Sequence, residues 1–168
     1  RRDTDRTSEL TRRLLEEIPG ITTILNCINS GPNPTMVEEE VILHGSGMFS
    51  DRIGRVTYRI SPFSFFQPNT LQAEKLFEAI REAACPDSTD ILYDLYCGLG
   101  AISLYLADTV KKVIGVESHA RSVELARENA ADHGTVNCSF FALDVMEALE
   151  GDFIATHEKP SIVILDPP

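Results

Sequence analysis

A glycine-containing turn in the middle of this 168-residue chain is the strongest sign of chemistry in its sequence. Residues 94–100 read DLYCGLG, and Gly98 and Gly100 fall where a predicted buried strand passes into a predicted helix. Glycine lets a backbone approach a ligand closely, and the N-terminus of the next helix presents free N–H groups. The dinucleotide fingerprint G-x-G-x-x-G would need a third glycine where Ser103 stands. The turn therefore disfavours a pyrophosphate cofactor, and a glycine turn without any ligand is the alternative.

Three carboxylates follow successive predicted strands at the same edge of the expected sheet. Glu117 closes a strand about 20 residues after the turn, where an acid can accept hydrogen bonds from the ribose hydroxyls of a nucleoside cofactor. Asp144 and Asp166 end the next two strands, and Asp144 is placed to accept a hydrogen bond from an adenine amino group. Each acid alone can be a helix cap or a solvated loop residue. Together with the turn they predict a site for S-adenosyl-L-methionine, which has a sulfonium and an ammonium group but no phosphates.

Composition restricts the partners and the location of the protein. Acids outnumber bases 26 to 15, for a net charge of −11, which by itself argues against a surface that binds nucleic acid. No apolar run approaches the roughly 18 residues that span a bilayer, and the N-terminal residues lack the apolar core of a signal peptide. The four cysteines include no C-x-x-C pair, so no metal site is expected. We expect a soluble cytoplasmic protein without a membrane segment.

The elements that must position these residues alternate between strand and helix after residue 90. A helix is predicted over 70–84, with Asn69 and Gln72 resembling a capping box. Predicted strands then alternate with predicted helices, which indicates a parallel sheet covered on both faces, the architecture of an α/β domain. The strands are predicted at 91–96, 112–117, 138–143 and 161–165, and the helices at 100–107, 119–132 and 145–155.

The residues before this pattern predict a smaller α+β unit. A helix over 7–18 ends at a Pro-Gly pair, and β-rich segments at 21–28 and 55–60 flank the turn-forming segment 30–34 and an apolar stretch at 37–43. We place the boundary after residue 66. Residues 1–66 form the small unit, and residues 67–168 form the cofactor-binding domain.

Four motifs in order resemble those of the RNA (uracil-5-)-methyltransferase family, which modifies tRNA and ribosomal RNA. They are SFFQPN at 64–69, DLYCGLG at 94–100, GVE at 115–117 and DPP at 166–168. The resemblance spans roughly residues 20–168, and the F-Q-x-N element separates this family from other methyltransferases. It implies a Rossmann-like class I S-adenosylmethionine-dependent methyltransferase domain, C-terminally truncated after its fourth strand.

The resemblance also implies which residues bind the cofactor. Gln67 and Tyr96 would contact it, Glu117 would hold the ribose, and the backbone of Gly98 and Gly100 would shape the pocket. Asp144 and Asp166 would line the same pocket. Family members often have Asn or Thr where this chain has Ala101, so only a backbone contact is expected there. The alternatives are that Gln67 merely precedes a helix and that Tyr96 is a core aromatic residue.

The chemistry implied by the resemblance needs a thiolate. Uracil C5 becomes nucleophilic once a thiolate has added to C6, and a base later removes the C5 proton. In the family the cysteine and a glutamate base lie downstream of the D-P-P motif, so both are expected beyond Pro168 and no catalytic residue is assigned within this chain. Cys97 is expected to be a packing residue beneath the cofactor rather than a nucleophile.

The sequence thus predicts the cofactor-binding core of an enzyme that methylates uridine C5 in RNA, either rRNA or tRNA. The RNA would be bound by the full-length protein, whose other segments can supply the basic surface that is missing here. Two alternatives stay open. One is a D-P-P methyltransferase that acts on nitrogen in nucleic acid or protein, and the other is a non-catalytic fragment that binds the cofactor.

Overall fold

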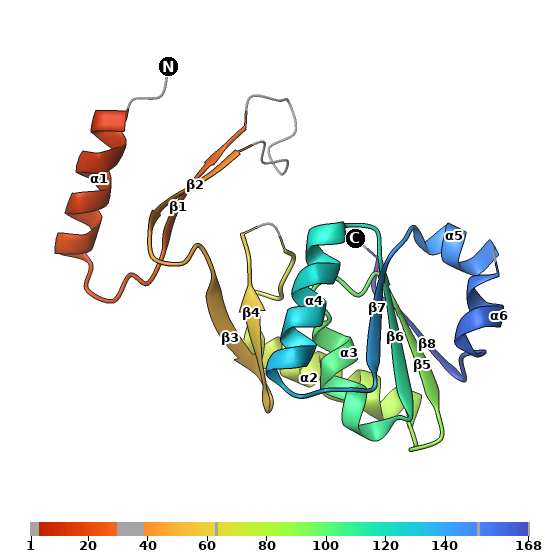
Figure 1. The fold of residues 1–168 in the computed structure, drawn as a ribbon. Coiled ribbons are helices and arrows are strands. Elements are labelled where there is room, and N and C mark those ends of the chain that lie inside the picture. Colours follow the sequence, from red (N-terminus) through yellow and green to blue (C-terminus); the bar gives the residue numbers. More distant parts are fainter. Residues whose placement is uncertain (1–3, 30–38, 63, 151, 168) are drawn as a thin grey trace. The chain divides into compact units, whose positions relative to one another are not determined.

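The computed structural model describes residues 4–29, 39–62, 64–150 and 152–167 and divides into two compact units (Figure 1). The first unit comprises Arg1–Phe49 with Ser61–Phe63, and the second comprises Ser50–Ile60 with Ser64–Pro168. The first contains helix α1 (Thr4–Glu17) and a two-stranded antiparallel sheet of β1 (Ile24–Ile28) and β2 (Glu39–His44). The predicted first helix and first strand are therefore present, whereas the predicted turn at 30–34 lies outside the described residues.

The second unit is built on a four-stranded parallel sheet. Its strands are β5 (Ile91–Leu95), β6 (Lys112–Glu117), β7 (Cys138–Ala142) and β8 (Ile162–Leu165), in the spatial order β7-β6-β5-β8. The chain thus builds the sheet outward from β5 in one direction and then returns to its other side with β8. Ligands of such sheets bind at the carboxyl ends of the strands where the order reverses. Here that point lies between β5 and β8.

Helices cover both faces of this sheet, as the alternating pattern predicts (Figure 1). Helix α3 (Ala101–Leu106), a short 3₁₀ helix η1 (Ala107–Thr109) and α4 (Ala120–Asp132) cover one face. Helices α5 (Val145–Glu150) and α6 (Phe153–His157) cover the other. The single helix predicted over 145–155 is therefore two short helices. Helix α2 (Thr70–Ala84) packs beside α3, where the rings of Phe77 and Tyr105 lie 5.4 Å apart in an edge-to-face arrangement.

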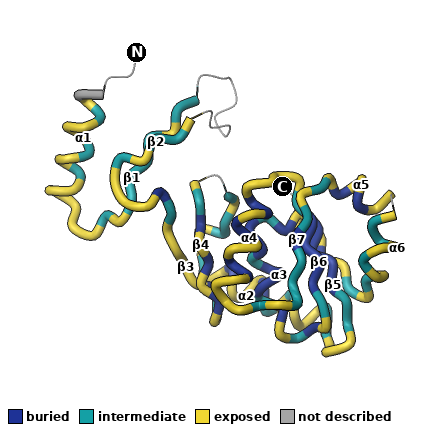
Figure 2. The backbone as a smooth tube through the Cα atoms, viewed as in Figure 1, coloured by how far each residue is buried: buried dark blue, intermediate teal, exposed yellow. Residues whose placement is uncertain are grey.

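The strands of the sheet are largely buried (Figure 2), and the buried side chains on both faces are mostly apolar. Tyr93 and Val116 pack against α5, and their neighbours Leu92 and Val113 on the same strands are equally buried from the other side. Strands with two buried faces are expected to be apolar throughout, as in most parallel sheets. A charged residue inside such a strand therefore needs a specific explanation, and β5 contains one, Asp94.

The strands β3 (Phe49–Ile53) and β4 (Val56–Ile60) pair with each other, and most of this hairpin belongs to the second unit. The hydroxyl of Tyr58 donates to the carbonyl of Ala101 at 2.9 Å, and the backbone N–H of Arg59 donates to the side chain of Asn129 at 2.8 Å. Arg55 also forms an ion pair with Asp108. These contacts explain why the compact units do not follow the predicted boundary after residue 66.

Helix α2 has the predicted bounds, and the side chain of Asn69 accepts a hydrogen bond from Gln72 N at 3.1 Å. Its apolar side chains are only partly buried, because Ala73 and Phe77 are buried whereas Leu71 and Leu76 are exposed.

Candidate functional site

The glycine turn connects β5 to α3 with three residues of positive φ. Tyr96, Gly98 and Gly100 have φ values of 70°, 55° and 83°. The turn is closed by a hydrogen bond from Gly100 N to Cys97 O at 2.8 Å, and the amides of Tyr96 and Cys97 both donate to Val116 O on β6. A non-glycine residue in the left-handed region costs on the order of 1–3 kcal/mol and is found mostly at functional sites. Tyr96 is therefore held in a strained conformation by the ends of two adjacent strands.

Neighbouring side chains explain two of the glycines. A Cβ at Gly100 would lie 3.1 Å from the ring of Phe140, and one at Gly115 would lie 2.4 Å from the same ring and 2.9 Å from Cys97 Sγ. A Cβ at Gly98 would meet open space. Glycine is thus favoured at position 98 by the positive φ and not by crowding. The Gly98 backbone faces an open region where a ligand can approach.

Glu117, at the end of β6, is held against the turn by hydrogen bonds. Its Oε2 accepts from Gly98 N at 3.2 Å, and its Oε1 accepts from His119 N at 2.8 Å and from Ser118 Oγ at 3.1 Å. The side chain is half-buried. These hydrogen bonds fix the carboxylate beside the glycine turn at the carboxyl edge of the sheet, and its role toward the ribose stays a prediction.

Asp94, the first residue of the DLYCGLG motif, also belongs to this site, although the motif alone did not identify it as a site residue. It is 1% exposed, and its Oδ2 accepts from Ser103 N at 3.0 Å and from Ser103 Oγ at 2.6 Å. Its Oδ1 is buried without a hydrogen-bond partner in the described part of the chain. Burial raises the pKa of Asp94 to about 6, and the nearby carboxylates of Asp166 and Glu117 contribute to the increase. The available signal was a single acid inside an otherwise apolar buried strand.

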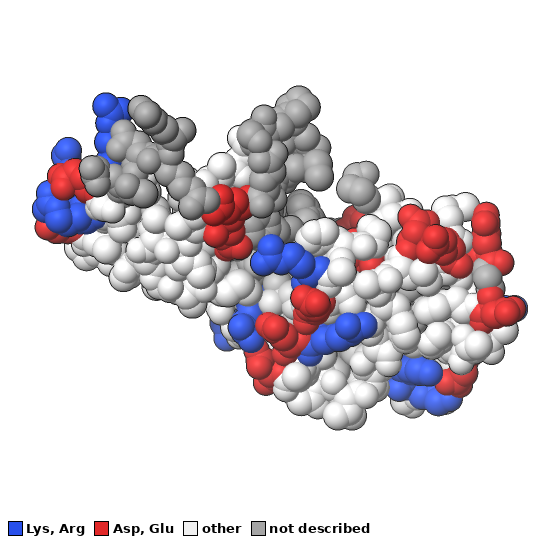
Figure 3. Space-filling model, turned by 45° about the horizontal axis from the view of Figure 1, so that its top comes forward, with Lys and Arg blue, Asp and Glu red and all other residues white. Residues whose placement is uncertain are grey.

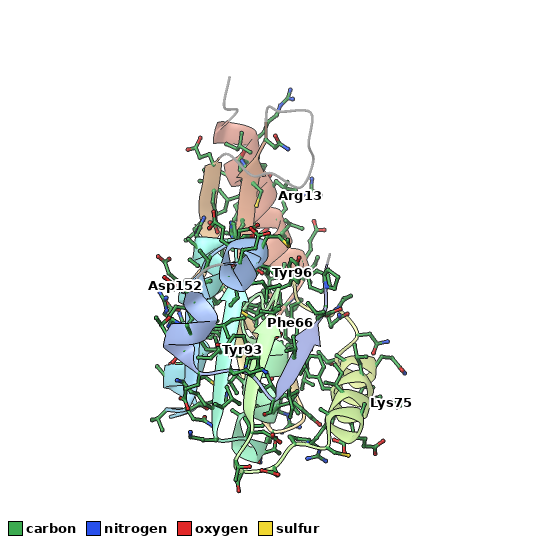
Figure 4. The ribbon with its side chains drawn as sticks, turned by 90° about the vertical axis from the view of Figure 1, so that its right-hand side faces the viewer. Arg13, Phe66, Lys75, Tyr93, Tyr96 and Asp152 are labelled. Atoms are coloured by element: carbon green, nitrogen blue, oxygen red, sulfur yellow. The ribbon has the colours of Figure 1, made fainter. Side chains whose placement is uncertain are left out.

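Asp166 and Tyr96 directly follow the two strands between which the strand order reverses. Strands β5 and β8 pair with Leu95 opposite Leu165, so both residues come at the carboxyl edge of the sheet. Asp166 is exposed. Tyr96 is also exposed, and it lies at the end of the sheet toward which the strand arrows point (Figure 4). The alternative interpretation of Tyr96 as a core aromatic residue is therefore wrong.

The remaining predicted residues have less direct connections to the turn. Asp144 is exposed and caps α5, since its Oδ1 accepts from Met146 N at 2.8 Å. Ala101 begins α3 and accepts a hydrogen bond from Tyr58. Gln67 is half-buried and follows Phe66, whose ring lies 5.5 Å from that of Tyr58. Roles of these residues in binding a cofactor stay predictions.

Cys97 and Cys138 are poor nucleophiles. Burial raises the pKa of Cys97 well above its usual value and raises the pKa of Cys138 to about 12. Since the thiolate is the reactive form, both thiols are protonated and unreactive at neutral pH. Cys97 lies against Gly115 beneath the turn, which agrees with its predicted packing role.

We expect iodoacetamide at pH 8 to modify Cys27 and Cys85, which are exposed, much faster than Cys97 and Cys138. Mass spectrometry of tryptic peptides after short reaction times measures this order. Unfolding in urea should abolish the difference and serves as the control. Rapid modification of Cys97 in the folded protein would contradict its assignment as a packing residue.

Within the residues that the structure describes, no group of three or more His, Cys, Asp and Glu side chains is arranged to hold a metal ion. No helix in the same residues is long and apolar enough to cross a membrane.

The strand order, the glycine turn and the acid at the end of β6 define a Rossmann-like domain of the kind that binds a nucleoside cofactor. Residues 37–153 match the family model described as tRNA (uracil-5-)-methyltransferase. The chain belongs to this family.

Known proteins that resemble the chain agree with this assignment. An RNA methyltransferase of Porphyromonas gingivalis is 37% identical over 91% of this chain and 33% of its own length. The crystal structure of the Pyrococcus abyssi tRNA (uracil-54, C5)-methyltransferase in complex with S-adenosyl-L-homocysteine is similar with a TM-score of 0.68 and 27% identity, over 88% of this chain and 35% of that one. The T. thermophilus 16S rRNA N2 G1207 methyltransferase, in complex with AdoMet and guanosine, has a TM-score of 0.57 and 27% identity, over 72% and 32% of the two chains. The fold is thus that of S-adenosylmethionine-dependent methyltransferases, and the chain spans about a third of the length of these relatives.

Proposed function

We propose that the protein is an S-adenosylmethionine-dependent methyltransferase that acts on C5 of uridine in rRNA or tRNA, and that this chain forms its cofactor-binding core. The observation that supports the cofactor most strongly is the placement of Asp94 and Glu117 beside the glycine turn, at the carboxyl edge of the parallel sheet. Membership of the uracil-5-methyltransferase family supports the substrate.

The residues at this edge fit S-adenosylmethionine. Asp94 has an unpartnered buried carboxylate oxygen, and Asp166 and Glu117 are close enough to raise its pKa. A cationic group would satisfy that oxygen and offset the repulsion among the three acids, whereas the phosphates of a dinucleotide would add to the repulsion. When bound, the cofactor supplies a methyl group activated by its sulfonium.

Each residue of the site has a proposed task. Glu117 would accept hydrogen bonds from the ribose hydroxyls, and the open backbone at Gly98 would lie against the cofactor, together with the backbone of Gly100 and Ala101. Asp94 and Asp166 would face its positive charge. Further contacts are proposed for Gln67, Tyr96 and Asp144.

The thiolate and the base are proposed to come from a part of the protein outside residues 1–168. Cys97 and Cys138 are protonated, and Cys27 belongs to the first compact unit. Cys85 is exposed at the C-terminal end of α2, in the connection that leads to the amino end of β5. None of the four is suited to add to uracil C6.

Contacts to RNA phosphates are also proposed to come mainly from other parts of the protein. Arg59 lies 3.2 Å from Glu128, and Lys111 and Lys112 lie 3.1 and 3.2 Å from Glu158. Blue and red side chains accordingly alternate over the second unit, and acids gather over α5 and α6 (Figure 3). Since phosphate binding requires cations that are not already neutralised, this surface has little of the charge that RNA needs.

Product analysis tests the proposed function. The full-length protein is incubated with unmodified rRNA or tRNA and methyl-labelled cofactor, and the digested RNA is analysed by mass spectrometry. We expect label in 5-methyluridine, and no transfer by the polypeptide of residues 1–168 alone. Label in an N-methylated nucleoside would support the nitrogen methyltransferase instead. Absence of transfer to any RNA by the full-length protein would contradict the proposal.

A further inference from the structure

Two buried polar side chains connect β4 to the glycine turn. We propose that Asn129 and Tyr58 are positioning residues, which hold the turn in the conformation that binds the cofactor although neither belongs to the predicted binding set. This inference rests on the proposed function, because it concerns the same site. It assigns to the β3–β4 hairpin a task in cofactor binding.

Asn129, on α4, is completely buried and uses both ends of its amide. Its Oδ1 accepts from Arg59 N at 2.8 Å, and its Nδ2 donates to Arg59 O at 3.2 Å and to Leu99 O at 3.3 Å. Leu99 is the residue between the two glycines of the turn. A single side chain therefore joins α4, β4 and the turn, and its amide has no donor left unsatisfied.

Tyr58, on β4, makes the second connection. It is completely buried, and its hydroxyl donates to Ala101 O at 2.9 Å. The centre of its ring lies 5.5 Å from the centre of the Phe66 ring. Phe66 directly precedes Gln67, which is predicted to contact the cofactor. Burial raises the pKa of the Tyr58 hydroxyl, so it remains a donor at any physiological pH. Strand β4 thus contacts both of the segments that the sequence motifs assign to the cofactor.

The two connections act on the carbonyls on either side of Gly100. The side chains hold Leu99 O and Ala101 O on the inner side of the turn, toward α4 and β4. Glycine has the largest conformational freedom to lose, and the turn contains Gly98 and Gly100 at positive φ. Holding the carbonyls restricts this freedom before the ligand arrives, so binding does not have to supply the cost of ordering the turn.

Asn137 provides a matched control within the same domain. Its Nδ2 also bridges two backbone carbonyls, Ala107 O at 2.7 Å and Val110 O at 3.1 Å. It precedes β7 and therefore lies at the amino end of the sheet, where its backbone carbonyl accepts from Val113 N. Removing its side chain should lower stability in the same way without a direct effect on the turn.

The test compares S-adenosyl-L-homocysteine affinity, by calorimetry, with melting temperature for Asn129→Ala, Tyr58→Phe and Asn137→Ala in the full-length protein. We expect about tenfold weaker binding for Asn129→Ala, which loses the hydrogen bond to Leu99 O and two to Arg59, and about threefold for Tyr58→Phe, which loses one hydrogen bond. Asn137→Ala should melt earlier and bind within twofold of the wild type. Tyr58→Phe keeps the ring and its packing on Phe66, so it tests the proposal even if Asn129→Ala does not fold.

The amide NMR signals of Gly98 and Gly100 give a readout that a loss of stability alone would not change. They should shift or broaden in Asn129→Ala and Tyr58→Phe, and stay unchanged in Asn137→Ala. Wild-type affinity in Tyr58→Phe and in folded Asn129→Ala would overturn the proposal, as would an equal loss of affinity in Asn137→Ala. A wild-type protein that does not bind S-adenosyl-L-homocysteine would instead refute the proposed function.

Discussion

Asp94→Asn is expected to raise the free energy of unfolding at pH 8 by about 1–3 kcal/mol while weakening S-adenosylmethionine binding tenfold or more. Burial raises the pKa of Asp94 from 3.8 to about 6, and a difference of about two pKa units corresponds to about 3 kcal/mol. The ionised side chain therefore destabilises the folded protein at neutral pH. Asparagine keeps an oxygen for the two Ser103 donors and removes the charge that we propose faces the cofactor.

The pH dependence follows from the direction of this shift. Above about pH 6 Asp94 is ionised in the folded and unfolded states, and its burial then lowers the free energy of unfolding by the full amount of about 3 kcal/mol. As the pH falls below 6 the folded protein binds a proton that the unfolded chain binds only near pH 4, so stability rises. The difference in free energy of unfolding between Asp94→Asn and the wild type should thus decrease by on the order of 1 kcal/mol from pH 8 to pH 5.5.

Urea unfolding of the wild type and of Asp94→Asn between pH 8 and 5.5 measures this difference in free energy. The contributions of other titrating groups are the same in both proteins and cancel. The range stays above the sequence pI of about 4.7, where the protein has little net charge. Asp51→Asn, which neutralises an exposed carboxylate on β3, is the control and should show no such trend. A constant difference between wild type and Asp94→Asn at every pH, or unchanged cofactor affinity, would show that Asp94 does not have this role.

Glu117→Ala is expected to reduce S-adenosyl-L-homocysteine affinity tenfold or more. The carboxylate accepts hydrogen bonds from the backbones of Gly98 and His119, and we propose that it also accepts from the ribose. Loss of hydrogen bonds to a charged group costs about 1.5–3 kcal/mol, which corresponds to at least a tenfold change in affinity. Calorimetry measures the change.

Glu124→Ala is the matched control for this variant, because it removes an exposed acid from α4 and changes the net charge equally. Its affinity should equal that of the wild type. Melting curves show whether Glu117→Ala is folded. A folded Glu117→Ala that binds as tightly as Glu124→Ala would exclude Glu117 from the cofactor site.

The sequence predicted the elements of the sheet domain well because each strand and helix has its own local signal. The apolar strands β5 and β6, the glycine turn and the cap at Asn69 all lie where the pattern placed them. The break between α5 and α6 was not predicted because the apolar pattern continues across it. The association of β4 with α4 was also not predicted, since it depends on contacts such as Asn129 with Arg59, which are 70 residues apart.

The candidate site was predicted in outline from the same local motifs. Glu117 and Asp166 could be placed at one edge because parallel strands end together. Asp94 was not selected because burial decides its role, and a sequence gives no direct measure of whether one oxygen of a carboxylate has a partner. Asn129 resembles an ordinary helix residue until the structure shows that its amide contacts two other elements.

The central claim is that the carboxyl edge of this sheet binds S-adenosylmethionine rather than a dinucleotide. Calorimetric titration of the protein with S-adenosyl-L-homocysteine and, separately, with NAD tests it most directly. Because the site has three neighbouring acids and lacks a third glycine, we expect S-adenosyl-L-homocysteine to bind at least tenfold more tightly than NAD. Equal affinity for the two ligands, or tighter binding of NAD, would contradict the claim.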